Sequence, residues 1–89
     1  MTYHIFLTRK AKKQLEKLEK EIQKQIKEKL HEIENNNKPL YEYDIVKLQN
    51  EKNKYRLRIG DYRILFEYIK QEKEIIIFAI LPRKNSYKI

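Results

Sequence analysis

Three arginines near the middle of the chain are the residues best placed to do chemistry. Arg56, Arg58 and Arg63 lie in the nine-residue segment YRLRIGDYR. Its first half alternates apolar residues with arginines, the period of a strand with one buried face. Gly60-Asp61 is then typical of a two-residue turn. The segment therefore predicts a tight hairpin with all three arginines on one face.

The register of this hairpin follows from the length of the turn. Ile59 should lie opposite Tyr62, and Arg58 should lie opposite Arg63. Like charges directly opposite each other destabilise a sheet. Guanidinium groups match the planar, bidentate geometry of phosphate. We therefore interpret the arginine face as an anion site, with phosphate as the natural ligand.

Composition favours an anionic partner. The 89 residues include 21 Lys and Arg against 13 Asp and Glu, a net charge of +8, which favours nucleic acid or another anionic surface. Four of the five arginines lie between Arg56 and Arg83, whereas the lysines are spread throughout. Lys47, Lys54 and Lys84 are further candidates for RNA contacts because they flank these arginines.

Several other functional classes are disfavoured. The chain has no cysteine, which excludes disulfides and thiolate metal sites and fits the reducing cytoplasm. Neither His4 nor His31 has metal-ligand spacing, the single glycine excludes a phosphate-cradling glycine loop, and Ser86 lacks a nucleophile's context. No apolar stretch is long enough for a membrane helix. We therefore expect no metal, no cofactor and no membrane partner.

The first half of the chain reads as a strand followed by helical sequence. Residues 3–7 form the expected strand, and Thr8 is a plausible helix N-cap. Apolar residues then recur at spacings of three and four from Ala11 to Ile33, which by pattern alone predicts one long helix. The asparagines at 35–37 and Pro39 should end it.

The second half reads as strands. Expected strands cover residues 43–48, the two hairpin arms up to residue 69, and residues 75–81. The last of these is apolar on both faces, which indicates a central strand with cover on both sides. The order of these elements, a strand, helical sequence and then four strands, predicts a single α+β domain over residues 1–89. Its small antiparallel sheet should pack one face on the helical layer and leave the arginine face partly open.

The motifs described above, taken in order, resemble those of a known family. The resemblance rests on Lys47-Leu48, on YRLRIGDYRILFE from Tyr55 to Glu67, on the apolar strand, and on Arg83-Lys84 followed by Tyr87. This combination, over nearly the whole chain, resembles the RelE/ParE superfamily of toxins from toxin–antitoxin pairs, and most closely its RelE branch. The resemblance implies a β-α-α-β-β-β-β fold, so the helical layer should be a hairpin with a break near residues 19–21.

The RelE-like resemblance also implies an activity. Such toxins enter the ribosomal A site and cut messenger RNA, whose own 2′-hydroxyl attacks the adjacent phosphate to leave 2′,3′-cyclic phosphate and 5′-hydroxyl ends. The implied partners are the ribosome, messenger RNA and a RelB-like antitoxin with an acidic, partly disordered segment. The family's catalytic residues correspond here to Arg56, Arg58, Arg63, Arg83 and Tyr87.

Two departures from the family pattern concern proton transfer. The first hairpin arm has arginines where some members have lysine, and arginine stays protonated, so neither can be a general base at neutral pH. Pro82 stands where many relatives have histidine. Two alternatives remain: a ParE-like toxin that poisons DNA gyrase, and a non-catalytic RNA-binding or regulatory module of the same fold. Arg83 with Tyr87 favours the nuclease.

Overall fold

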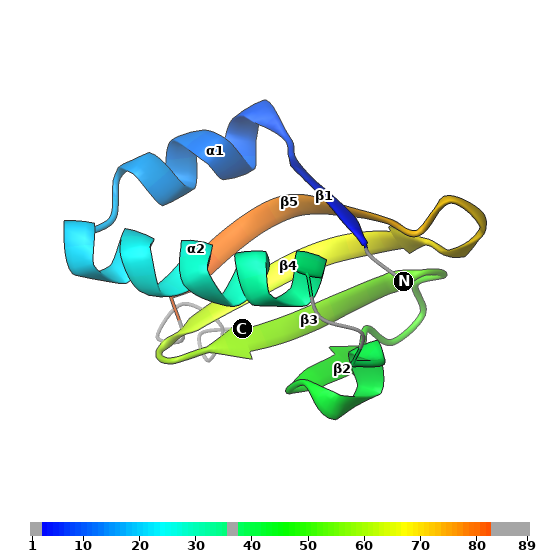
Figure 1. Cartoon of the computed structure of the whole chain (residues 1–89). Coiled ribbons are helices and arrows are strands. Elements are labelled where there is room, and N and C mark those ends of the chain that lie inside the picture. The colour runs from blue at the N-terminus through cyan, green and yellow to red at the C-terminus, as the bar shows by residue number, and fades with distance from the viewer. Residues whose placement is uncertain (1–2, 36–37, 83–89) are drawn as a thin grey trace.

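The computed structural model describes residues 3–35 and 38–82 and shows two helices packed on one face of a five-stranded sheet (Figure 1). The elements in chain order are β1 (His4–Leu7), α1 (Arg9–Glu16), α2 (Lys20–Asn35), η1 (Leu40–Glu42), β2 (Ile45–Lys47), β3 (Lys54–Ile59), β4 (Tyr62–Ile69), η2 (Lys70–Glu72) and β5 (Glu74–Pro82). The α+β class expected from the sequence is confirmed.

The sheet has the order β1-β5-β4-β3-β2 and is mixed. β1 runs parallel to β5, while the other neighbours are antiparallel. The expectation of a wholly antiparallel sheet was therefore wrong at one edge. The helical segment carries the chain from β1 at one edge to β2 at the other, so β1 is free to join β5, which comes last in sequence (Figure 1).

The helical layer is a hairpin rather than one long helix. The Thr8 hydroxyl accepts a hydrogen bond from the Ala11 N–H at 3.2 Å, as expected of an N-cap. α1 ends at Glu16 and α2 begins at Lys20. The break implied by the family resemblance therefore exists, but it falls about two residues earlier than expected. The Gln23 amide donates to the carbonyls of Glu16 and Leu18 at 3.2 and 2.8 Å, which satisfies acceptors freed by the break.

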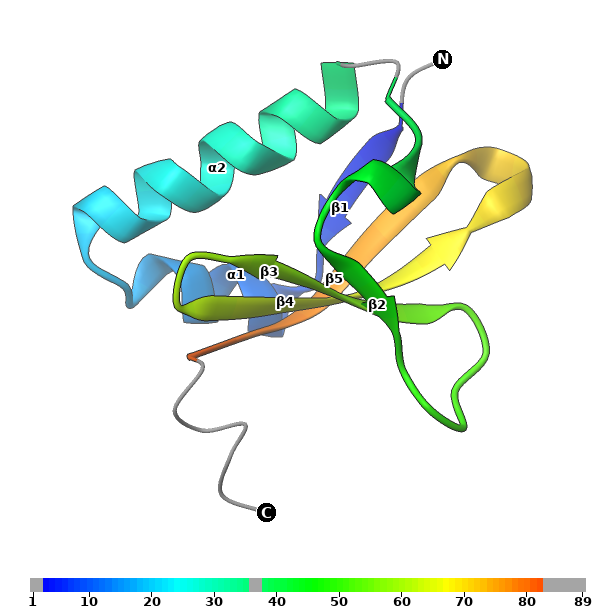
Figure 2. The same ribbon diagram turned by 90° about the horizontal axis from the view of Figure 1, so that it is seen from below.

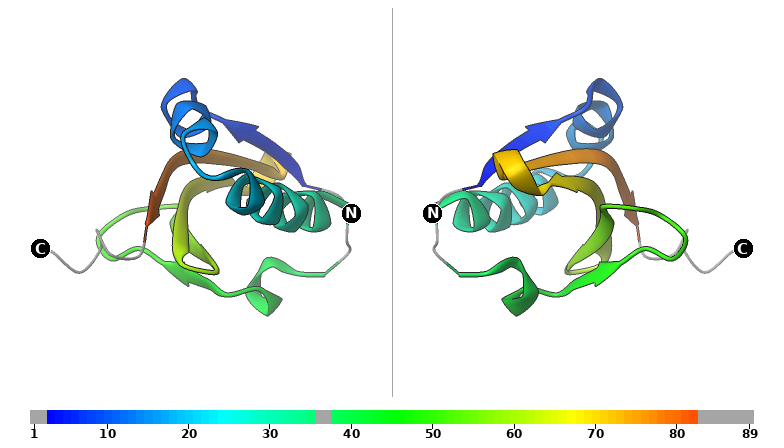
Figure 3. Two further views of the ribbon diagram at one scale, coloured as in Figure 1. Left: turned by 90° about the vertical axis from the view of Figure 1, so that its left-hand side faces the viewer. Right: turned by 90° about the vertical axis from the view of Figure 1, so that its right-hand side faces the viewer.

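The core lies between the helices and the covered face of the sheet. α2 lies against the concave side of the twisted strands (Figures 2 and 3). The apolar stripe supplies the helical half of the core, and alternate strand residues supply the other half; they are Ala11, Leu15, Ile26, Leu30, Ile33, Leu57, Ile59, Ile64, Phe66, Ile75, Ile77 and Ile80. Burying such a side chain is worth about 1.5–3 kcal/mol for each large residue, so this layer determines which face of each strand points inward.

The opposite face of β5 is also apolar. β5 is an interior strand, as its composition predicted, since β1 and β4 flank it. On the face away from the core, Ile76, Phe78 and Leu81 are partly buried and Phe6 of β1 is 51% exposed. Neither α1 nor α2 covers this face, so the cover expected on both sides is found on only one within the described residues.

Candidate functional site

The β3–β4 hairpin has the predicted register. Ile59 pairs with Tyr62 and Arg58 pairs with Arg63. Gly60 has a φ of +56°, and no positive φ occurs at Asp61. A positive φ at the first central position alone is the requirement of a type II′ turn, one of the two turns that match the twist of paired strands. The local sequence therefore determines which arginines face each other.

The structure brings the three hairpin arginines to the face that the helices leave uncovered. Leu57 and Ile64, which alternate with them, point into the core. Arg56 and Arg58 of β3 and Arg63 of β4 therefore point the other way. Arg58 has a side chain 51% exposed, while Arg56 and Arg63 are partly buried. We call this group the arginine face.

Arg58 and Arg63 approach each other closely across the hairpin. The backbone N–H of Arg58 donates to the carbonyl of Asp44 at 3.0 Å, toward β2 and away from β4. Arg58 and Arg63 therefore form a non-hydrogen-bonded pair, in which opposite Cα atoms are about 4.5 Å apart. Two guanidinium groups on such a pair create a positive potential that an oxyanion relieves.

Asp44 is a member of this site that the sequence did not reveal. Its Oδ2 accepts a hydrogen bond from Arg58 Nε at 2.8 Å, and both side chains are 51% exposed. Asp44 directly precedes β2, which is joined to β3 through residues 48–53. A connection of that length does not determine the register of the two strands. No local signal therefore pointed from Asp44 to Arg58.

The structure separates two of the lysines that the sequence grouped together. Lys54 lies on the arginine face, two positions before Arg56; its Nζ is 3.1 Å from Glu51 Oε1 and 5.5 Å from the centroid of the Phe78 ring. Lys47 pairs with Tyr55 and therefore points to the helical side. There it lines a groove of about 240 Å³ with Leu40, Tyr41, Ile45, Tyr55, Phe66 and Tyr68. Lys54 thus extends the arginine face and Lys47 does not.

The remaining expected site residues, Arg83, Lys84 and Tyr87, lie outside the described residues. The last described residue is Pro82, which pairs with Tyr62 beside the hairpin turn. The described sheet therefore ends at the same end as the Arg58–Arg63 pair.

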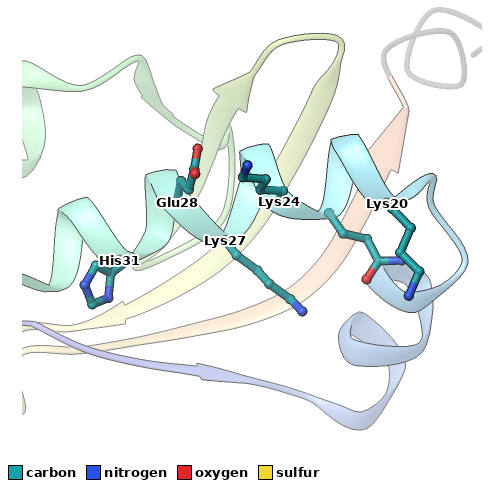
Figure 4. A pocket seen from close by; sticks show the side chains of 6 residues that line it. Lys20, Lys24, Lys27, Glu28 and His31 are labelled. Atoms are coloured by element: carbon teal, nitrogen blue, oxygen red, sulfur yellow. The ribbon is translucent and has the colours of Figure 1, made fainter.

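A second basic surface lies on the helical layer. Lys20, Lys24 and Lys27 project from α2 around an open groove of about 580 Å³, with Gln23, Glu28 and His31 (Figure 4). None of the three lysines forms an ion pair within the described part of the chain. This surface is on the opposite side of the sheet from the arginine face, so the two are separate basic regions.

Residues 3–35 and 38–82 contain neither a metal-binding cluster nor a membrane-spanning helix. No group of three or more His, Cys, Asp or Glu side chains there is arranged to hold a metal ion. In the same ranges, no helix has the length and apolar character that crossing a membrane requires.

Comparisons with known proteins agree with this architecture. Residues 5–87 match the family described as ParE toxin of type II toxin–antitoxin systems. A Methanocaldococcus jannaschii chain named as a toxin, RelE1, is 28% identical over 88 residues, which cover 99% of this chain and 98% of that one.

Solved structures show the same similarity. The RelE–RelB complex of Pyrococcus horikoshii matches with a TM-score of 0.76 and 29% identity, covering 93% of this chain and 97% of the matched chain. The RelB–RelE antitoxin–toxin complex of Methanococcus jannaschii matches with a TM-score of 0.75 and 32% identity, covering 92% of this chain and 94% of the matched chain. The isolated Escherichia coli RelE toxin, at 20% identity and a TM-score of 0.70 over 90% and 83% of the two chains, shares the fold.

Proposed function

The chain belongs to the ParE toxin family of type II toxin–antitoxin systems, and from its similarity to RelE toxins over nearly the whole chain we propose that it is a ribosome-dependent messenger endonuclease of the RelE type. The observation that carries the proposal is the arginine face. Arg58 lies opposite Arg63, with Arg56 beside them, on the side of the sheet that neither helix covers. Three guanidiniums in this arrangement fit a phosphodiester better than they fit an uncharged ligand.

The proposed reaction is an in-line transfer within the messenger. The 2′-hydroxyl loses its proton to solvent as its oxygen attacks the adjacent phosphorus, the bond from phosphorus to the 5′-oxygen breaks, and the 5′-oxygen takes a proton from solvent. The products are a 2′,3′-cyclic phosphate and a 5′-hydroxyl. Arg56, Arg58 and Arg63 bind the phosphate and stabilise the negative charge that develops on it, which is usually the largest single contribution to catalysis. Arginine stays protonated at neutral pH, so these three residues cannot accept the 2′-hydroxyl proton.

The C-terminal residues complete the proposed site. Arg83 stabilises the transition state or assists the departure of the 5′-oxygen. Tyr87 positions the base or the 2′-hydroxyl, since an aromatic ring can stack on an unpaired base. Lys54 and Lys84 add contacts to the RNA backbone. Lys47, on the other side of the sheet, would contact a different part of the RNA.

An antitoxin is the proposed protein partner. The solved relatives from Pyrococcus and Methanococcus are complexes of RelE with RelB. A net charge of +8 favours an acidic antitoxin segment that becomes ordered as it covers the basic surface. Co-expression with the product of the neighbouring gene, followed by pull-down, tests this partner. A soluble, harmless toxin that captures no such protein would contradict it.

Single-turnover cleavage of messenger on programmed ribosomes tests the activity. The expected result is a single cut per A-site codon, with cyclic phosphate ends, weak cutting of free RNA, and a fall in cleavage when Arg56, Arg63 or Arg83 is changed to Ala. The matched control is Arg9→Ala, an exposed arginine on α1. Three or four phosphate contacts should give a slope of log K against log salt of roughly −2 to −3. Efficient cutting of free RNA, or a flat salt response, would contradict the proposal.

Gyrase poisoning is the second candidate, because the matching family is described by the ParE toxin. Supercoiling by purified gyrase is the discriminating assay. If the protein inhibits gyrase and leaves ribosome-bound messenger intact, the ParE-like activity replaces the nuclease. If it does neither but binds RNA, the regulatory module is the remaining function.

A further inference from the structure

Four residues form a row across the uncovered face. Asp44 lies beside Arg58, Arg58 pairs with Arg63, and Arg63 pairs with Leu81 of β5. Arg58 therefore has an acidic neighbour on one side and a basic neighbour on the other. The next row along the strands is Val46, Arg56, Leu65 and Ala79, which contains no carboxylate. Asp44 is thus the acidic residue of this row, and it forms an ion pair with Arg58.

The contact between Asp44 and Arg58 uses one particular edge of the guanidinium. Oδ2 of Asp44 accepts from Nε, at 2.8 Å. A guanidinium is planar and carries five N–H donors in a fixed fork. With the Nε–H engaged, the four donors on the two Nη atoms remain for another ligand. Because the group is rigid, holding Nε also determines the direction in which the Nη edge points.

The backbone holds Asp44 in place for this contact. Its carbonyl accepts the Arg58 N–H at 3.0 Å, and the following residue, Ile45, pairs with Leu57. Ile45 packs against the core. The carboxylate is therefore carried by a segment anchored to β3, and it does not depend on a flexible loop to reach Arg58.

We propose that Asp44 is a positioning residue of the RNA site: its carboxylate holds Arg58 so that the Nη edge of the guanidinium is presented to the scissile phosphate. This inference rests on the proposed nuclease function. The same carboxylate repels the negative charge of the bound RNA. Asp44 should therefore weaken RNA binding while it accelerates cleavage, since orientation acts on the reacting geometry.

Two variants separate orientation from charge. Asp44→Ala removes both the acceptor and the charge, whereas Asp44→Asn keeps an acceptor oxygen and removes the charge. In single-turnover cleavage on programmed ribosomes, Asp44→Ala should lower the saturating rate by about tenfold or more, as expected when a reacting group is misplaced. Asp44→Asn should lose less of this rate. Both variants should reach half of their maximal rate at a lower toxin concentration than the wild type.

Two controls test whether Asp44 acts through Arg58. Asp61, the other aspartate in the chain, is exposed in the hairpin turn and forms no ion pair with any described residue. Asp61→Asn should therefore leave unchanged both the saturating rate and the toxin concentration that gives half of it. In an Arg58→Ala background, Asp44→Ala should cause no further fall in rate. An equal fall in both backgrounds, or a wild-type saturating rate in Asp44→Ala, would overturn the proposal.

A spectroscopic measurement keeps the inference testable apart from the nuclease function. In the free toxin, the Arg58 Nε–H should give a distinct NMR signal protected from exchange with water, and Asp44→Ala should abolish that protection. Titration with inorganic phosphate should shift the Arg58 Nη signals in the wild type. If the wild type fails to cleave but these signals behave as stated, the proposed function fails and the Asp44–Arg58 geometry stands. An unprotected Nε–H in the wild type would overturn the positioning role.

Discussion

Arg58 on β3 lies directly opposite Arg63 on β4, on the face of the sheet that neither helix covers. Like charges at such a pair oppose folding, and Asp44 offsets part of the repulsion through its contact with Arg58. A pair that contributes little to the fold can be altered without unfolding the protein, so that its proposed role in phosphate binding can be measured separately. This separation makes the site directly testable.

Arg58→Gln should abolish function while leaving the fold almost unchanged. The substitution removes both the repulsion from Arg63 and an exposed ion pair, and exposed pairs are worth only about 0–1 kcal/mol. The free energy of unfolding should therefore change by less than about 0.5 kcal/mol, the usual range for surface substitutions. Cleavage on programmed ribosomes should fall by about a hundredfold, the scale of one well-placed electrostatic donor. Urea denaturation and single-turnover kinetics measure the two effects, and full cleavage activity would contradict the assignment of Arg58 to the phosphate site.

Gln14→Ala should destabilise the fold through a single lost hydrogen bond. The side-chain carbonyl of Gln14 on α1 accepts the backbone N–H of Ile80 at 2.8 Å, at a part of β5 that extends beyond β1. Ile80 is 3% exposed, and leaving a buried donor unsatisfied costs about 1–3 kcal/mol. Urea denaturation of Gln14→Ala measures this cost. Gln49→Ala, at an exposed position, is the control, and an equal change in both variants would contradict the role of Gln14.

Gly60→Ala should strain the hairpin turn. Gly60 has a φ of +56°, and an L-residue in the left-handed region costs roughly 1–2 kcal/mol. A Cβ there would also lie 3.3 Å from Nε2 of Gln25 on α2. Because the Gln25 side chain is exposed and can move, Gln25→Ala should rescue little of the loss. Thermal and urea unfolding of the single and double variants measure the loss of stability. Complete rescue by Gln25→Ala would show that the contact with Gln25, and not backbone strain at residue 60, causes this loss.

Tyr68 should make stability depend on pH in the alkaline range. Burial raises the pKa of Tyr68 above its ordinary value of 10.0. Electrostatic interaction and a side-chain hydrogen bond with Tyr3, and electrostatic interaction with Tyr55, raise this pKa further. The unfolded state therefore loses this proton at a lower pH than the folded state does. The stabilisation is fully present below pH 10 and is lost as the pH rises through the folded-state pKa.

Unfolding free energies measured from pH 8 upward test this expectation. Tyr68→Phe should flatten the alkaline decline. Tyr41→Phe, which changes a residue that is 82% exposed, should keep the wild-type profile. If the Tyr68→Phe profile matches that of the wild type, another group causes the decline.

The parts of this protein that the sequence by itself determined are the local ones. The register of Ile59 with Tyr62 and of Arg58 with Arg63 was predictable because a two-residue turn leaves no freedom in pairing, and alternation then assigns the faces. The Thr8 cap was predictable because an N-cap satisfies an amide only three residues away. The prediction of two helices, in contrast, came from the family resemblance, because the apolar stripe continues through the break between α1 and α2.

The remaining features were decided by the tertiary structure, because they depend on contacts between residues that are far apart in the chain. The parallel pairing of β1 with β5 joins the two ends of the described sequence. The side of the sheet reached by Lys47, and the contact of Asp44 with Arg58, depend on how β2 aligns with β3 across a six-residue connection. A shift of one residue in that register would send Lys47 to the arginine face and Asp44 away from it. Packing of Ile45 into the core selects the observed register, and packing is a property of the folded chain as a whole.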